Sequence, residues 1–102
     1  MIIRISTGSF PADARAEVEG ALVASQDSLR AAISALPGLI HYYAGIDGVA
    51  GRVVNVSVWD DAVHARAMDG LAQMRAQRPI LQAAGVSFEP ITNHEIVWTI
   101  TP

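Results

Sequence analysis

The sequence predicts an α+β domain of the ferredoxin-like βαββαβ type, with an antiparallel sheet and both helices on one face. Three observations lead to this fold. Short β-branched runs alternate with two longer segments of helical periodicity, turn residues join the two central runs, and no internal repeat interrupts the order. We therefore expect residues 1–102 to form one domain, which at this length can bury a real core.

The first half of the chain predicts a strand, a helix and a hairpin. Ile2 to Thr7 is β-branched and is followed by the breakers Gly8 and Pro11. From Ala12 to Leu36, apolar residues recur at steps of three, four and seven, which predicts an amphipathic helix ended by Pro37 and Gly38. Two apolar runs then flank a turn-rich stretch and predict a hairpin: Leu39 to Ile46, Asp47 to Gly51, and Arg52 to Trp59.

The second half predicts a helix and a last strand. Asp60 or Asp61 can cap a helix whose apolar stripe runs to Met74. We expect Pro79 to open a separate short helical turn that Gly85 ends. A short extended piece, Val86 to Glu89, and a full strand, His94 to Thr101, complete the order.

Composition limits the classes of function. The net charge of −3 and the scattering of seven cations, all arginine, argue against nucleic acid as a partner. The absence of cysteine excludes disulfides and thiolate chemistry. No signal peptide or membrane span is recognisable, so we expect a cytoplasmic protein with no membrane partner. The chain is 51% hydrophobic and only 17% charged, which leaves apolar surface for self-association.

Strand alternation divides the sheet into two faces. We expect the uniform valines of the third strand, together with Tyr42 and Ile46, to lie under the helices. The opposite face then carries Arg4, His41, Tyr43, Asn55, Ser57 and Trp59. That mixture is too apolar for a solvated surface and too polar for a plain core, so it needs a cover. A second copy would give a two-fold dimer whose facing sheets enclose a barrel-like cavity for a small ligand.

Three stretches carry a family resemblance: LPGLIHYYAGIDG, RVVNVSVWDDAVHARAM, and the final strand after FEP. Together they resemble the dimeric α+β barrel proteins of the antibiotic biosynthesis monooxygenase type. The resemblance implies oxygenation of an aromatic or polyketide-like substrate in a pocket between sheet and helices, without a cofactor. In such a reaction the deprotonated substrate itself would give an electron to dioxygen, and the protein would supply a dry pocket, a base and donors for the oxyanion.

The resemblance also suggests site residues. Quinone-forming members use an Asn and a Trp on the third strand, and Asn55 and Trp59 match that spacing. The Tyr that follows the Trp in those enzymes has no counterpart here, where His64 stands nearby. Asn55 and Trp59 would orient the substrate and its oxyanion, and either His64 or His41 would accept a proton.

The remaining candidates are substrate-binding groups, and each has a structural alternative. His41, Tyr43, Ser57 and Arg4 would contact the ligand, although Arg4 could instead pair with Glu95 on a neighbouring strand. Trp59 could simply plug one end of the barrel. The three histidines lack the spacing of a metal site, so we expect no metal. The alternative function is a non-catalytic small-molecule binding or stress-response dimer that uses the same cavity.

Overall fold

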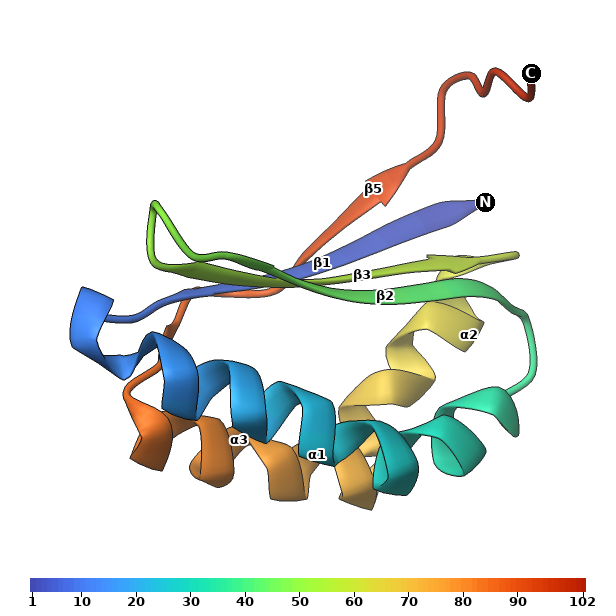
Figure 1. Ribbon diagram of the computed structural model, residues 1–102. Coiled ribbons are helices and arrows are strands. Elements are labelled where there is room, and N and C mark those ends of the chain that lie inside the picture. The colour runs from blue at the N-terminus through green and yellow to red at the C-terminus, as the bar shows by residue number, and fades with distance from the viewer.

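The computed structural model describes residues 1–102 as two layers, a five-stranded antiparallel sheet and a layer of helices on one of its faces (Figure 1). The strand order is β2-β3-β1-β4, and β5 also pairs with β1. This confirms the α+β, ferredoxin-like prediction. None of the helices combines the length and the hydrophobicity needed to cross a bilayer. The strands are β1 (Ile2–Ser9), β2 (Leu39–Asp47), β3 (Arg52–Trp59), β4 (Ser87–Phe88) and β5 (Thr92–Glu95).

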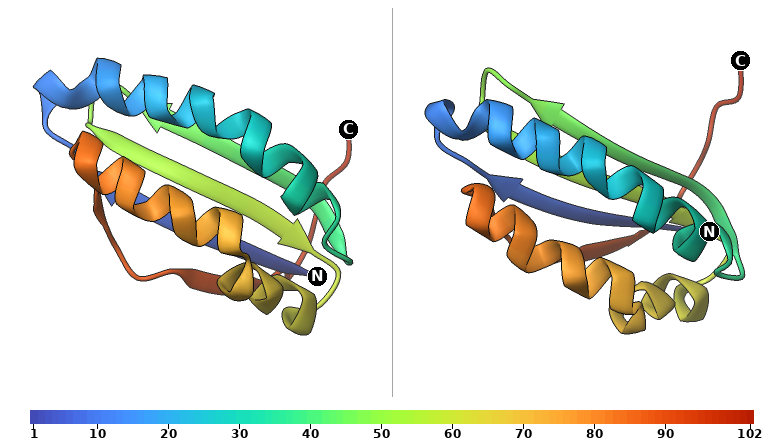
Figure 2. Two further views of the ribbon diagram at one scale, coloured as in Figure 1. Left: turned by 90° about the horizontal axis from the view of Figure 1, so that it is seen from below. Right: turned by 60° about the horizontal axis from the view of Figure 1, so that its bottom comes forward.

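Two long helices run side by side across the sheet, as Figure 2 shows. They are α1 (Arg15–Ser34), preceded by the 3-10 turn η1 (Ala12–Ala14), and α3 (Ala72–Ala84). A short helix, α2 (Ala62–Arg66), and a second 3-10 turn, η2 (Ala67–Gly70), fill one end of the layer between β3 and α3.

The register shows which side chains face the helices. Trp59 is opposite Ile2 and Val53 is opposite Gly8, and both buried side chains belong to hydrophobic clusters that include residues of α1. The side chains between them on β3 share that face, which we call the helix-side face. The face away from the helices, called the open face, carries Ile3, Ile5, Tyr43, Val54, Val56 and Val58.

The predicted facing of β1 and β3 was therefore wrong, whereas that of β2 was right. Arg4, Asn55, Ser57 and Trp59 lie on the helix-side face, where the valines had been expected. Alternation fixes which residues share a face but not which face becomes covered. Val53 and Trp59 pack into the two hydrophobic clusters with residues of α1, and this packing places their face under the helices.

The hydrophobic core is divided between the two ends of the helix layer. One cluster contains Phe10, Val18, Val53, Leu81 and Val86. The other contains Leu29, Ile33, Trp59, Ala65 and Met68. Along β3, Asn55 and Ser57 lie between Val53 and Trp59 and thus between the two clusters. The middle of the helix-side face is consequently polar.

The helix boundaries differ from the prediction at Pro79. The helical segment after β3 breaks between η2, which ends at Gly70, and α3, because the backbone of Leu71 is extended; Pro79 lies inside α3. An exposed proline interrupts one backbone hydrogen bond, and the neighbouring turns of α3 maintain the helix around it. Gly85 ends α3 as predicted, with a φ of 119° and with the Val86 N–H donating to the Leu81 carbonyl at 3.0 Å.

The last strand is shorter than predicted. β5 ends at Glu95, and the Ile96 N–H donates to the Met1 carbonyl at 2.9 Å, where the chain of its partner strand begins. Residues 97–102 belong to no strand. That segment, which we call the C-terminal tail, projects away from the body on the side opposite the helices (Figure 1). Its apolar side chains are exposed, Val97 by 89% and Trp98 by 74%.

Two valines of α1 that differ in burial provide a test of the core assignment. Val18 is fully buried, whereas Val23 on the same helix is 67% exposed. We expect Val18→Ala to lower the free energy of unfolding by about 2 kcal/mol, because it removes two buried methyl groups and leaves a cavity. Val23→Ala should change it by less than about 0.5 kcal/mol. Urea unfolding of both variants measures the difference, and equal losses would contradict this core.

Candidate functional site

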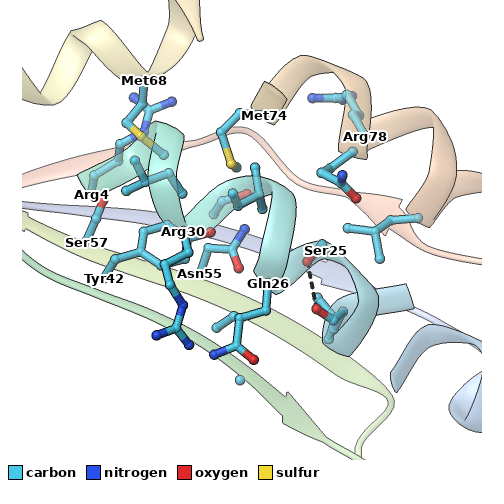
Figure 3. Close-up of a pocket in the computed structure, with 18 of the residues that line it drawn as sticks. Arg4, Ser25, Gln26, Arg30, Tyr42, Asn55, Ser57, Met68, Met74 and Arg78 are labelled. Atoms are coloured by element: carbon cyan, nitrogen blue, oxygen red, sulfur yellow. Dashed lines mark hydrogen bonds between the residues drawn. The ribbon is translucent and has the colours of Figure 1, made fainter. Parts of the chain in front are cut away.

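A cavity of about 830 Å³ lies between the sheet and the helices α1 and α3, in the polar gap between the two hydrophobic clusters (Figure 3). Its volume is within the range of small-molecule sites, and its walls are partly apolar, as such sites require. Leu29 and Ile33 come from α1, Met74 and Leu81 from α3, and Met68 from η2.

The sheet contributes a row of polar side chains to this cavity. Asn55 on β3 is opposite Ser6 on β1 and Ala44 on β2, and Ser57 is opposite Arg4 and Tyr42. The Asn55 side chain makes no hydrogen bond within the protein and is partly exposed. Its amide therefore has both a donor and an acceptor available for a ligand.

Trp59 acts on this row indirectly. Its indole is completely buried among the side chains of α1 and α2 and is absent from the cavity wall. The Nε1–H donates to the Ser57 Oγ at 2.8 Å. Because Ser57 accepts this bond, its own O–H is available to donate into the cavity. Trp59 thus positions Ser57.

Tyr42 is a site residue that the sequence analysis missed. It was expected among the helix-facing residues, and it does lie there, but in the cavity wall opposite Ser57. Burial raises the pKa of its phenol to about 12. The phenol therefore keeps its proton at neutral pH and can act as a hydrogen-bond donor.

Arg4 reaches from the sheet to the helix layer. Its Nη2 lies 2.6 Å from Asp69 Oδ1 on η2, and the side chain is only 8% exposed. The alternative pairing with Glu95 does not occur. Other charged residues also line the cavity, among them Arg30, Asp69, Arg75 and Arg78. Nothing in the sequence around them distinguished them from ordinary surface charges.

The histidines occupy three separate places. His64 is not among the cavity residues; its Nδ1 lies 2.6 Å from Asp60 Oδ1 at the corner between β3 and α2. His41 borders the cavity, but its position opposite Val58 directs its side chain to the open face, where the ring stacks on Tyr43 at a centroid distance of 5.8 Å. His94 is near Thr92 on exposed β5. Of the predicted residues, the cavity unites Arg4, Asn55, Ser57 and His41, but not Trp59, His64 or Tyr43.

The groups around His64 stabilise the turn between β3 and α2, which we call the corner. Asp61 caps α2 by accepting the His64 N–H at 2.8 Å, as the sequence suggested. Gly38 packs on the imidazole so closely, with a φ of 82°, that a Cβ there would lie 2.3 Å from Nδ1. Asp60, Asp61 and His64 offer ligand atoms within 4.8 Å of one another. These groups hydrogen-bond to one another at the surface of the molecule.

Comparisons with known proteins identify the fold. No protein-family model and no curated protein matches the sequence. A crystal structure of a proposed antibiotic biosynthesis monooxygenase from Deinococcus radiodurans is similar with a TM-score of 0.75 and 21% identity, over 100% of this chain and 98% of that chain. SnoaB, a cofactor-independent oxygenase from Streptomyces nogalater, has a TM-score of 0.71 and 17% identity, over 99% and 97% of the two chains. The chain therefore has the fold of the antibiotic biosynthesis monooxygenases.

The His64–Asp60 pair predicts a window of pH-dependent stability. The hydrogen bond to Asp60 raises the pKa of His64 and lowers that of Asp60. The contribution of His64 is complete below its unfolded pKa of about 6.5 and is lost as pH rises through the raised folded value. The contribution of Asp60 is present above its unfolded pKa of about 3.9 and is lost as pH falls through the lowered value.

We therefore expect His64→Gln to lower the Tm most at about pH 4–6.5, and progressively less as the medium becomes alkaline. Thermal unfolding followed by circular dichroism across this range measures the difference from the parent. The control is His94→Gln, because the His94 ring contacts a hydroxyl and not a carboxylate. A Tm difference for His64→Gln that does not vary with pH would contradict the ion pair.

Proposed function

We propose that the protein is a cofactor-independent monooxygenase that acts on an aromatic or polyketide-like substrate in the cavity between the sheet and the helices. The observation that carries the proposal is the row of donors formed by Arg4, Tyr42, Asn55 and Ser57 beneath apolar walls. The fold shared with SnoaB, itself a cofactor-independent oxygenase, adds support.

In this proposal the substrate provides the electrons. A substrate with an activated CH₂ group loses a proton, the resulting anion transfers an electron to dioxygen, and the two radicals combine to a peroxide. Loss of water leaves one oxygen atom as a new carbonyl and the other in water, so no external reductant is required. The protein's contribution is to stabilise the anion and exclude bulk water.

The residues divide this work. The amide of Asn55 stabilises the oxyanion, Ser57, held by Trp59, orients the ring, and the guanidinium of Arg4 supplies positive charge at one end of the cavity. The proposal assigns proton acceptance to His41 through a bridging water, because His41 borders the cavity while its ring lies on the open face against Tyr43, and because His64 is bound to Asp60 outside the cavity. Trp59 is a positioning residue, since it reaches the cavity only through Ser57.

Oxygen uptake with a panel of anthrones and hydroquinones tests the activity. Asn55→Ala should lower kcat/KM by about 100-fold or more, as expected for loss of one oxyanion donor. Asn93→Ala on exposed β5 is the matched control and should retain parental activity. His41→Gln should shift the acidic limb of the pH profile, whereas His64→Gln should not.

The opposite result is equally informative. If no substrate of the panel consumes oxygen above the buffer rate while the aromatics still bind, the protein is a non-catalytic small-molecule binder that uses the same cavity. If Asn55→Ala is as active as the parent, Asn55 is not an oxyanion donor.

We also propose that the protein is a homodimer in which a second copy covers the open face. That face carries six β-branched or aromatic residues from three neighbouring strands, and Tyr43 is 58% exposed. The C-terminal tail leaves the body on the same side, belongs to no strand, and exposes Val97 and Trp98 to water. A second copy satisfies both surfaces at once.

Sedimentation equilibrium at micromolar concentration tests this arrangement. The parent should sediment with twice the mass of one chain, and Val56→Asp on the open face should shift it to the monomer because a charge would be buried in the interface. The control is Val63→Asp, because the Val63 side chain on α2 is 67% exposed. A monomeric parent would overturn the dimer and leave the cavity proposal intact, because all the cavity residues belong to one chain.

A further inference from the structure

Arg4 is a buried cation with an exposed partner. The arginine side chain is 8% exposed, whereas that of Asp69, its only salt-bridge partner, is 61% exposed. The guanidinium has five N–H donors, and Asp69 is the one side chain that accepts from it. No buried side-chain nitrogen or oxygen lacks a partner, so the remaining donors of Arg4 are not sealed in protein. They are available to the cavity that Arg4 lines.

The two members of this pair differ in their freedom to move. Arg4 is held under the helices beside the buried side chain of Met68, as Figure 3 shows. Asp69 is on the short turn η2, and its carboxylate can be rehydrated by a rotation toward solvent. Separating the pair thus costs Asp69 little, provided that another anion takes its place on Arg4.

The charge of the cavity wall also favours an anion. The whole chain carries a net charge of −3. The wall, by contrast, contains more cations than anions, namely Arg4, Arg30, Arg75 and Arg78 against Glu19 and Asp69. Cations concentrated around a partly enclosed space attract anionic ligands, and this local excess opposes the sign of the molecule as a whole.

We propose that the ligand of this cavity is an aromatic carboxylate whose carboxyl group binds Arg4 and displaces Asp69. The inference rests on the proposed function in that it concerns the same cavity, and it specifies the substrate class. Asp69 already places a carboxylate on this guanidinium, so the site is built for that group. The apolar walls formed by Leu29, Ile33 and Met74 accommodate the aromatic body.

The position of the carboxylate orients the ring. Ser57 is opposite Arg4 across the strand pair, and Asn55 is two residues further along β3 on the same face. A ligand anchored at Arg4 therefore extends its ring past Ser57 toward Asn55. This places the acid group at one end of the cavity and leaves the Asn55 amide for a second polar group of the ligand.

Binding of a matched pair of probes tests the inference without turnover. Naphthoate and its neutral amide, naphthamide, have nearly the same shape and differ in charge. Anaerobic fluorescence titration gives their dissociation constants for the parent protein. We expect naphthoate to bind about 10- to 100-fold more tightly, as expected for a charge-assisted hydrogen bond to a buried guanidinium.

Three variants locate the effect. Asp69→Asn should tighten naphthoate by about threefold or more, because a neutral amide competes less well for Arg4, and should leave naphthamide unchanged. Arg4→Met should abolish the preference for the acid. Asp27→Asn and Arg52→Met are the matched controls, since neither residue lines the cavity. Circular dichroism melts verify that each variant is folded.

The outcomes separate this inference from the proposed function. Equal affinity for acid and amide in the parent, or no binding of either probe, would overturn it even if oxygen uptake is observed. A preference that survives Arg4→Met but disappears in Arg30→Gln, Arg75→Gln and Arg78→Gln together would assign the anion to the helix arginines instead. If Arg4→Met does not fold, an unchanged naphthoate affinity in Asp69→Asn overturns the displacement of Asp69.

Discussion

The burial of the Trp59 indole against α1 and α2 fixes the orientation of β3, and the other two central strands follow from it. The indole is fully enclosed, and its N–H is bonded to Ser57 two residues earlier on the same strand face. A one-residue shift of β3 would expose the indole and bring a valine under the helices. Ser57 and Asn55 are therefore held beneath the helices, and pairing extends this constraint to Arg4 on β1 and Tyr42 on β2.

The cavity exists because no large side chain fills the middle of the helix-side face. The helices rest on two clusters, one at each end of the sheet, and the small or polar residues Ser6, Ala44 and Asn55 between them do not fill the space below α1 and α3. A site formed in this way has rigid supports on both sides. Its polar groups come from strands, which position side chains more accurately than loops do.

Much of the fold could be predicted from the sequence because local signals determine it. The β3 strand from Arg52 to Trp59, the cap at Asp61 and the helix end at Gly85 each depend on residues close in the chain. The facing of β3 could not be predicted in this way, because it depends on what packs above the strand. The break at Gly70 in place of Pro79, and the end of β5 at Glu95, likewise depend on the surrounding tertiary structure.

The candidate site was predicted only in part for the same reason. Asn55 and Ser57 stood out because polar groups within a valine-rich strand need partners, and they do lie in the cavity. Tyr42 and Asp69 did not stand out, since a tyrosine in a strand and an aspartate in a helical segment are ordinary. His64 attracted attention through its position near Trp59 in the sequence, but the turn at Asp60 directs it to the corner with Gly38.

The division of the core into two clusters affects how the molecule unfolds locally. Each cluster packs a different end of the helix layer against the sheet, and the cavity separates the two clusters where a continuous core would otherwise join them. Either end can thus loosen without disrupting the other, as in proteins whose segments exchange amide hydrogens at unequal rates. A ligand in the cavity would contact both clusters and join them into a single cooperative unit. The resistance of the fold to local unfolding would then depend on whether a ligand is bound.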